Sequence, residues 1–219
     1  MCIRDRGDNY YSTEMWHETI QQHDGTISRR PVGDNGFISS PEDWVLSGPH
    51  FFLANPFNQT PKRVCETHRA YDNVDLETIP DDYLPRTNYL PGCSSAEYAD
   101  RTPRVPWGGT GADRSPLVTS YFRFIARSML SQAGGRTLIS GVFPPGVGHI
   151  DPCNSLTFEK LSNLIAFGTA SISVVADFWV KTTGNPRFRD NLARFMPVPE
   201  LPLMAHSRYL ALNCITQYY

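Results

Sequence analysis

"SPLVTSYFRFIARSMLSQAGGRTLISGVFPPGVGH", Ser115 to His149, carries the clearest secondary-structure signals in this sequence. Ser115 suits an N-cap, and Pro116 suits the first helical position because its missing N–H has no helical partner there. Apolar residues then recur at a spacing of four: Leu117, Tyr121, Ile125 and Met129. We therefore predict an amphipathic helix that starts at Ser115 and ends at Gly134-Gly135.

A strand, a turn and two further helices are expected downstream. The apolar run "RTLISGVF" (136–143) predicts a buried strand, and "PPGVGH" (144–149) predicts the turn that closes it. A long helix is expected over residues 155–183, with Gly184 as its stop. Its apolar face would hold Leu161, Ile165, Gly168, Ile172, Val175 and Trp179. "SRYLALNCIT" (207–216) predicts the last helix.

The chain upstream of residue 115 has little periodicity and many turn-forming residues. The whole sequence contains 18 prolines and 16 glycines in 219 residues, which predicts a loop-rich N-terminal half. "DWVLSGPHFFLANP" (43–56) predicts a short strand on each side of Gly48-Pro49. We interpret residues 55–115 as extended chain anchored by aromatic side chains, namely Tyr83, Tyr89, Tyr98 and Trp107. The expected fold class is α+β, with a loop-rich region over 7–114 and a core over 115–219.

Composition and charge narrow the class of protein. The formal net charge of −2 argues against a free-standing nucleic-acid binder, although a basic face balanced by acids stays possible. The five cysteines are scattered along the sequence, which favours free thiols in a reducing cytoplasm. The sequence has no apolar run long enough to cross a bilayer and no signal peptide, so a cytoplasmic protein is expected.

The first six residues have an unusual composition. "MCIRDR" (1–6) resembles the translation of an adapter used in building sequencing libraries. We therefore expect the natural sequence to begin near Gly7 and the chain to be a fragment of a longer protein.

One short motif, Asn55-Pro56-Phe57, is similar to a catalytic motif of amino-group DNA methyltransferases. In those enzymes the Asn side chain and a Pro carbonyl accept hydrogen bonds from the target amino group, and the aromatic ring stacks on the flipped base. A working site also needs a Gly-rich cofactor loop and an acidic ribose ligand. Residues 7–50 supply neither, and the motif lacks its second proline. We interpret it as a loop, and no catalytic residue is predicted.

Two cysteine–histidine pairs contain residue types that occur in metal and nucleophile sites. Cys65 and His68 could provide two metal ligands or a thiol–imidazole pair, but no second close pair completes a four-ligand zinc site. A nucleophilic cysteine also needs a base and an oxyanion hole. We favour a structural cysteine near a surface histidine. "HIDPC" (149–153) is interpreted as a turn before a helix, with His149 as a candidate ligand contact and no metal.

Five arginines provide the main binding signal of the sequence. They are Arg86, Arg104, Arg123, Arg127 and Arg136, and they are interleaved with Tyr89, Trp107, Tyr121 and Phe122. Arginine forks match phosphate oxygens and guanine edges. The alternative is a solvated helix face with arginine–carboxylate pairs. On the predicted helix, Arg123 and Arg127 would share one face.

Several segments together resemble one family. They are "WHETIQQHDGTI", "WVLSGPHFFLANPFNQTPKRVC", "YDNVDLETIPDDYLPRTNYLPG", "RTPRVPW", "YFRFIARSMLSQAGGRTLISGVFPPGVGHID", "ADFWVKTTG" and "RYLALNCIT". In this order they resemble the C-terminal half of large bacterial adenine-specific DNA methyltransferases of type IIG restriction-modification and related phage-defence systems. Those enzymes carry a TaqI-like target-recognition domain. The resemblance covers nearly all of residues 9–219.

The resemblance implies a division of labour within a longer parent chain. An upstream domain would bind S-adenosylmethionine and methylate adenine N6, while this region would bind double-stranded DNA and read base edges. The implied DNA-binding residues are Arg86, Arg104, Arg123, Arg127, Arg136 and His149. The fragment alone would be inactive and would bind no cofactor. Two alternatives stay open: a complete but degenerate methyltransferase that uses Asn55-Pro56-Phe57, and a protein-interaction module.

Overall fold

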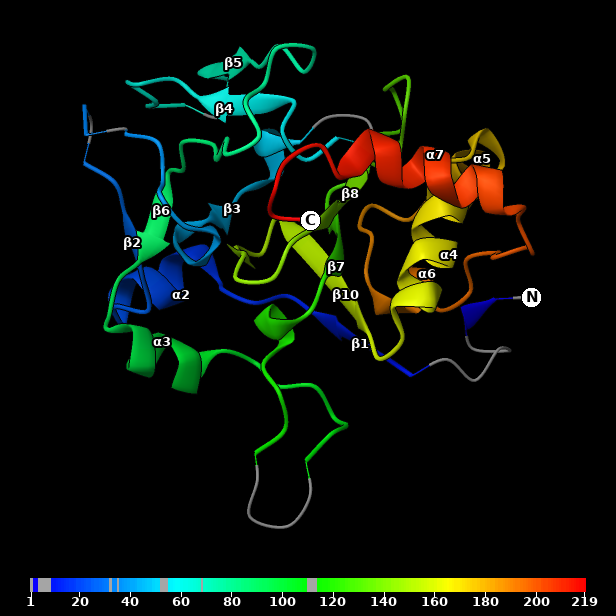
Figure 1. The fold of residues 1–219 in the computed structure, drawn as a ribbon, viewed down its shortest axis with the longest axis horizontal. Coiled ribbons are helices and arrows are strands. Elements are labelled where there is room, and N and C mark those ends of the chain that lie inside the picture. Colours follow the sequence, from blue (N-terminus) through cyan, green and yellow to red (C-terminus); the bar gives the residue numbers. More distant parts are fainter. Residues whose placement is uncertain are drawn as a thin grey trace.

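The computed structural model describes residues 2–3, 9–31, 33–34, 36–51, 55–67, 69–109 and 114–219. Its fold is α+β, as the sequence predicts. A four-stranded antiparallel sheet crosses the middle of the molecule in the order β1-β10-β7-β8 (Figure 1). These strands are β1 (Tyr10–Thr13), β7 (Arg123–Arg127), β8 (Ser140–Phe143) and β10 (Cys153–Phe158).

A second sheet of shorter strands lies to one side of the first, with the order β2-β6-β3-β9 (Figure 1). Its strands are β2 (Ile27–Arg29), β3 (Val45–Leu46), β6 (Tyr89–Pro91) and β9 (Gly148–His149). The nearby helices α2 (Glu18–His23) and α3 (Ser95–Arg101) are short. A separate hairpin consists of β4 (Gln59–Pro61) and β5 (Tyr71–Asn73).

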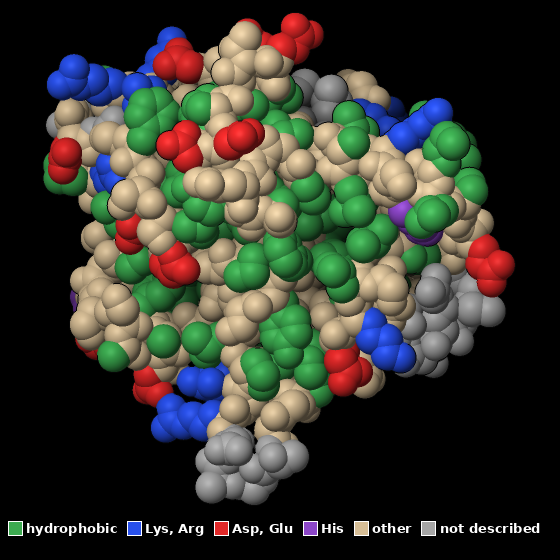
Figure 2. All heavy atoms as spheres, in the orientation of Figure 1, with side chains coloured by type: hydrophobic (Ala, Val, Ile, Leu, Met, Phe, Trp, Pro, Cys, Tyr) green, Lys and Arg blue, Asp and Glu red, His purple; other side chains and the backbone are tan. Residues whose placement is uncertain are grey.

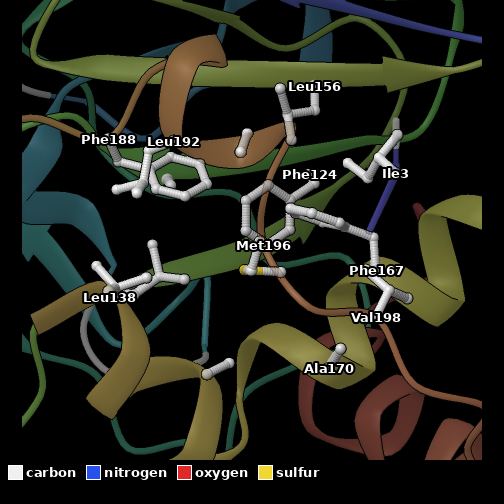
Figure 3. Packing of buried hydrophobic residues seen from close by; sticks show 14 of the residues in the cluster. Ile3, Phe124, Leu138, Leu156, Phe167, Ala170, Phe188, Leu192, Met196 and Val198 are labelled. Atoms are coloured by element: carbon white, nitrogen blue, oxygen red, sulfur yellow. The ribbon is translucent and has the colours of Figure 1, made fainter. Parts of the chain in front are cut away.

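Four helices cover the other side of the first sheet: α4 (Leu161–Ser171), α5 (Val174–Thr182), α6 (Asp190–Ala193) and α7 (Leu203–Asn213). Their contact with the sheet forms the largest hydrophobic cluster. Figure 3 shows Phe124 of β7 beside Phe167 of α4, with Met196 next to them. Burying aromatic and aliphatic side chains here is the main favourable contribution to folding that this layer makes.

The opposite face of the first sheet packs against the second sheet and its loops. Ile125 of β7 and Cys153 of β10 lie in a cluster with Trp44, Phe57 and Phe143. Successive side chains of a strand point to opposite faces, so Phe124 meets the helices and Ile125 meets the second sheet. β7 is therefore a central strand that is buried on both faces.

The predicted helix that starts at Ser115 is wrong. Its residues form a 3-10 turn (Val118–Ser120), strand β7 (Arg123–Arg127) and a loop. A strand that is buried on both faces shows a continuous apolar run instead of alternation, so its pattern can satisfy a spacing of four by chance. The aromatic and β-branched residues in "YFRFI" favoured a strand.

The predicted long helix over 155–183 is also wrong as a single element. It begins with strand β10, and the rest forms α4 and α5, whose axes differ by 76°. The Ser173 side chain accepts a hydrogen bond from the Ala176 backbone N–H (3.1 Å), which caps α5 and separates it from α4. A strand within 136–143 is confirmed as β8, and the last helix is found at α7, about one turn earlier than predicted.

The N-terminal half combines irregular chain with short elements. A strand before Gly48-Pro49 is confirmed as β3, whereas Gly48–His50 forms a 3-10 turn and residues 52–54 lie outside the described part. α3 was not predicted. The aromatic residues Tyr89 and Tyr98 are buried. β1 pairs with β10 and β3 pairs with β9, so both sheets combine strands from 7–114 and 115–219.

Ile3, within the stretch expected to be adapter-derived, packs in the helix-side cluster, and the origin of that stretch stays a prediction. Among the described residues no single helix has the length and hydropathy of a membrane span. The bent pair α4–α5 satisfies both criteria when its two helices are taken together.

Candidate functional site

A cleft of about 480 Å³ lies where the second sheet, the β4–β5 hairpin and the end of β7 meet. Polar residues from distant parts of the sequence line it, namely Glu18, Arg29, Ser47, Tyr71, Asn88 and Arg127. Its apolar walls include Pro49, Met129, Ile150 and Pro152. A volume of this size is within the range of about 300–1,000 Å³ that is usual for small-molecule sites.

Secondary structure places each cationic side chain of the cleft. Arg29 ends β2 and pairs with Tyr89 of β6. Arg127 ends β7 and pairs with Cys153 of β10. The Arg127 side chain lies against Gly48, because a Cβ atom at residue 48 would be 3.8 Å from Arg127 Nε.

These two arginines differ from other arginines of the chain in their charge partners. Among the residues that the structure describes, neither guanidinium forms an ion pair. By contrast, Arg101, Arg114 and Arg189 each pair with a carboxylate.

One carboxylate also lines the cleft. Glu18 begins α2, and its Oε1 accepts a hydrogen bond from the Tyr89 hydroxyl. Burial raises the pKa of Tyr89, and the Glu18 carboxylate raises it further, so the phenol keeps its proton and donates. No partner of Glu18 Oε2 is seen among the described residues. The cleft therefore offers an acceptor beside two strong donors.

A chain of hydrogen bonds runs from the cleft to the buried His50 side chain. Asn88 Nδ2 donates to the Tyr71 hydroxyl (3.0 Å), which lies 3.1 Å from Ser47 Oγ. Ser47 Oγ lies 3.2 Å from His50 Nδ1, and His50 Nε2 lies 2.9 Å from the Arg86 carbonyl oxygen. That carbonyl can only accept, so Nε2 carries the proton and Nδ1 accepts from Ser47.

Burial keeps this chain of hydrogen bonds neutral. It lowers the pKa of His50, which is fully buried, and it raises the pKa of Tyr71. Because His50 stays neutral, the hydrogen bonds hold Tyr71 and Asn88 in fixed positions. Among the described residues, no partner of the second amide proton or of the side-chain oxygen of Asn88 is seen, so both can face a ligand.

Of the six predicted DNA-binding residues, only Arg127 lines the cleft. Arg123 and His149 are fully buried instead, and no duplex can touch them in this fold. Arg123 donates to the Val147 carbonyl oxygen, and burial lowers its pKa to about 10. Burial, with a smaller contribution from Arg123, lowers the pKa of His149 to about 3. The predicted helix on which Arg123 and Arg127 would share one face is wrong, because both residues belong to strand β7.

Arg136 has a structural role between two helices. Its Nη1 donates to the Ile172 carbonyl oxygen at the C-terminus of α4 (3.1 Å), and its Nε lies 3.6 Å from Asp177 Oδ1 of α5. A cation at a helix C-terminus satisfies free carbonyl groups and the helix dipole. Arg136 thus joins α4 to α5.

The remaining two predicted arginines are half-buried outside the cleft. The Arg86 guanidinium lies 4.3 Å from the centre of the Phe37 ring, a cation–π contact. Arg104 Nη1 donates to the Ser115 carbonyl oxygen (2.8 Å). The structure therefore does not bring the six predicted residues together.

Asn55-Pro56-Phe57 is packed into the protein. Asn55 Nδ2 donates to the Leu212 carbonyl oxygen (2.6 Å), and Asn55 Oδ1 accepts from the Phe57 backbone N–H (2.8 Å). The Phe57 ring is fully buried between Trp44 and Tyr83. Both ends of the Asn55 amide hold intramolecular hydrogen bonds, and the Phe57 ring has no exposed surface to stack on a flipped base, so the degenerate-methyltransferase alternative is not supported.

The structure describes only one member of the Cys65–His68 pair. Cys65 is buried and its Sγ contacts the Thr67 carbonyl oxygen (3.5 Å), whereas His68 lies outside the described part. Within those described ranges no group of three His, Cys, Asp or Glu side chains could hold a metal ion. "HIDPC" contains a turn, but the turn joins β9 to β10 and does not precede a helix.

Sequence reasoning missed Glu18, Arg29 and Asn88, because only the fold brings these residues together. One local signal was available: "SGPH" places Pro49 at the start of a turn with Ser47 and His50 three residues apart, which is capping-box spacing. Searches of protein-family models, curated proteins and solved structures found no match to this chain.

Proposed function

We propose that this chain binds double-stranded DNA as the target-recognition region of a bacterial adenine-specific DNA methyltransferase. One structural observation supports the proposal most strongly: Arg29 and Arg127 line one cleft, and neither forms an ion pair with a described residue. Unpaired guanidinium forks suit phosphate oxygens and guanine edges. The sequence resemblance described above supplies the methyltransferase context.

Further cations lie on a loop that contributes to the cleft wall. Arg63 and Arg69 are exposed and belong to the β4–β5 loop, which also supplies Cys65 and Thr67 to the cleft wall. On the face drawn in Figure 2, by contrast, Lys and Arg side chains are scattered at the margin among acidic ones. We therefore assign the DNA contact to the cleft and its surrounding loops.

In this proposal the parent chain, a restriction-modification or phage-defence enzyme of the bacterial cytoplasm, binds S-adenosylmethionine through an upstream domain. That domain would also share the phosphate contacts. This division accounts for the net charge of −2 in a DNA-binding region.

Duplex binding across a salt series tests the proposal. If Arg127 contacts a phosphate, Arg127→Ala should weaken binding to all sequences and lower the salt slope by about one unit. If it reads a guanine, the loss should be about 1–3 kcal/mol and confined to one position of the site. Arg208→Ala, an exposed arginine of α7, is the matched control. Unchanged affinity and slope in both Arg127→Ala and Arg29→Ala would refute the proposal.

A further inference from the structure

We propose that the cleft holds a single unpaired guanine base, an inference that rests on the proposed DNA binding and makes it specific. The first argument is the mixture of groups in the cleft. A site for phosphate alone would contain donors only, because a carboxylate repels an anion. Here Glu18 lies in the same cleft as Arg29 and Arg127. That mixture fits a neutral ligand with both acceptors and donors on its edges.

Guanine matches this mixture better than the other bases. It carries two adjacent acceptors, O6 and N7, which suit one arginine fork, and an N2 amino group that donates. The carboxylate of Glu18 can accept from that amino group through Oε2, since its Oε1 accepts from Tyr89. Adenine has only one acceptor on the same edge, beside an amino donor, so an arginine fork fits it poorly.

The presence of Glu18 and the arginines in one cleft favours a base outside the helical stack. In a duplex the O6/N7 edge faces the major groove and the N2 amino group faces the minor groove. One cleft can meet both edges only when the base has left the stack. The walls contain Pro49, Ile150 and Pro152. Apolar side chains of this kind can pack against the two faces of a flat ring.

Two more features suit this ligand. Met129 lines the cleft with 66% of its surface exposed, which leaves it free to cover a base. Asn88 is fixed by its hydrogen bond to Tyr71, and its free amide groups can bind a further polar atom of the nucleotide. Arg29 is exposed and can reach the flanking phosphates.

The test uses the chain and three DNA duplexes of equal length, with one bulged guanine, one bulged adenine or no bulge. We expect the guanine bulge to bind about tenfold more tightly than the adenine bulge. This ratio is near the lower end of the range by which one good base contact favours the correct base over a wrong one. Glu18→Gln should remove most of this preference, while its amide oxygen still accepts from Tyr89. Glu77→Gln, which changes an exposed glutamate outside the cleft, should keep the preference.

The outcomes separate this inference from the proposed function. Equal binding of both bulged duplexes, or a preference that Glu18→Gln leaves intact, would overturn the guanine site. If the fully paired duplex still bound with a salt dependence that Arg127→Ala reduces, the proposed function would stand without it. Absence of binding to all three duplexes would overturn both.

Discussion

Buried polar residues show how strongly the environment changes the role of a single side chain. His149 and Arg127 both look like ligand-binding residues in the sequence, yet His149 is fully buried and Arg127 lines a cleft. His149 Nε2 lies 2.9 Å from Ser155 Oγ, so a hydroxyl of β10 satisfies the imidazole inside the protein. Residue type alone predicted the capacity for hydrogen bonding but not the partner.

His149 leads to a prediction about acid stability. Its pKa is about 3 in the folded chain, below the value of about 6.5 expected when the chain is unfolded. The unfolded state therefore binds more protons between these two pH values. The free energy of unfolding should be undiminished above about pH 6.5 and should fall towards pH 3 by up to about 1.4 kcal/mol per unit.

Urea unfolding between pH 7 and pH 4 measures this slope. His149→Gln should reduce the slope, and part of it should remain because burial lowers the pKa of His50 as well. His17→Gln, an exposed histidine, is the control and should leave the slope unchanged. If His149→Gln had the same slope as the unchanged chain, His149 would not be a cause of the acid sensitivity.

At the scale of elements, one close contact sets how α4 and α7 pack. Gly168 of α4 lies against the ring of Tyr209 of α7, and a Cβ atom at residue 168 would overlap that ring. The ring is fully buried, so it cannot move aside into solvent. Glycine is required here for close approach and not for backbone freedom.

Gly168→Ala should lower the free energy of unfolding by about 1–3 kcal/mol, the usual cost of overpacking a core. Alanine favours a helix by about 1 kcal/mol over glycine, which offsets only part of this cost. Gly135→Ala is the control, because no atom lies within 4 Å of a Cβ atom there. Urea unfolding of both variants measures the difference, and equal stabilities would refute the close contact.

At the scale of the whole molecule, the two halves of the sequence share both sheets. β1 forms the edge of the first sheet beside β10, and β9 pairs with β3 in the second. The first sheet buries one face against the helices and the other against the second sheet. Removing residues 1–114 would therefore expose one whole face of the first sheet.

This arrangement predicts that residues 115–219 do not fold as a separate unit. Expressed alone, they would lose β1 and the partners of Ile125 and Cys153. We expect poor dispersion of amide resonances and no cooperative thermal transition, in contrast to the whole chain. Adding residues 1–114 should restore both signals if the halves associate. A cooperative transition in 115–219 alone would show an independent core.

The sequence by itself determined the α+β class, the strand within 136–143, a last helix near the C-terminus and the loop character of Asn55-Pro56-Phe57. The first three features depend on local propensity and turn residues. The last depends on the absence of a second proline and of a Gly-rich cofactor loop. The tertiary structure decided that Arg123–Arg127 is a strand, because burial on both faces removes the alternation that marks a strand and leaves only residue composition as a local signal. It also decided the cleft, whose groups come from positions between Glu18 and Pro152. Long-range strand pairing brings those groups together, and no local spacing in a sequence records such pairing.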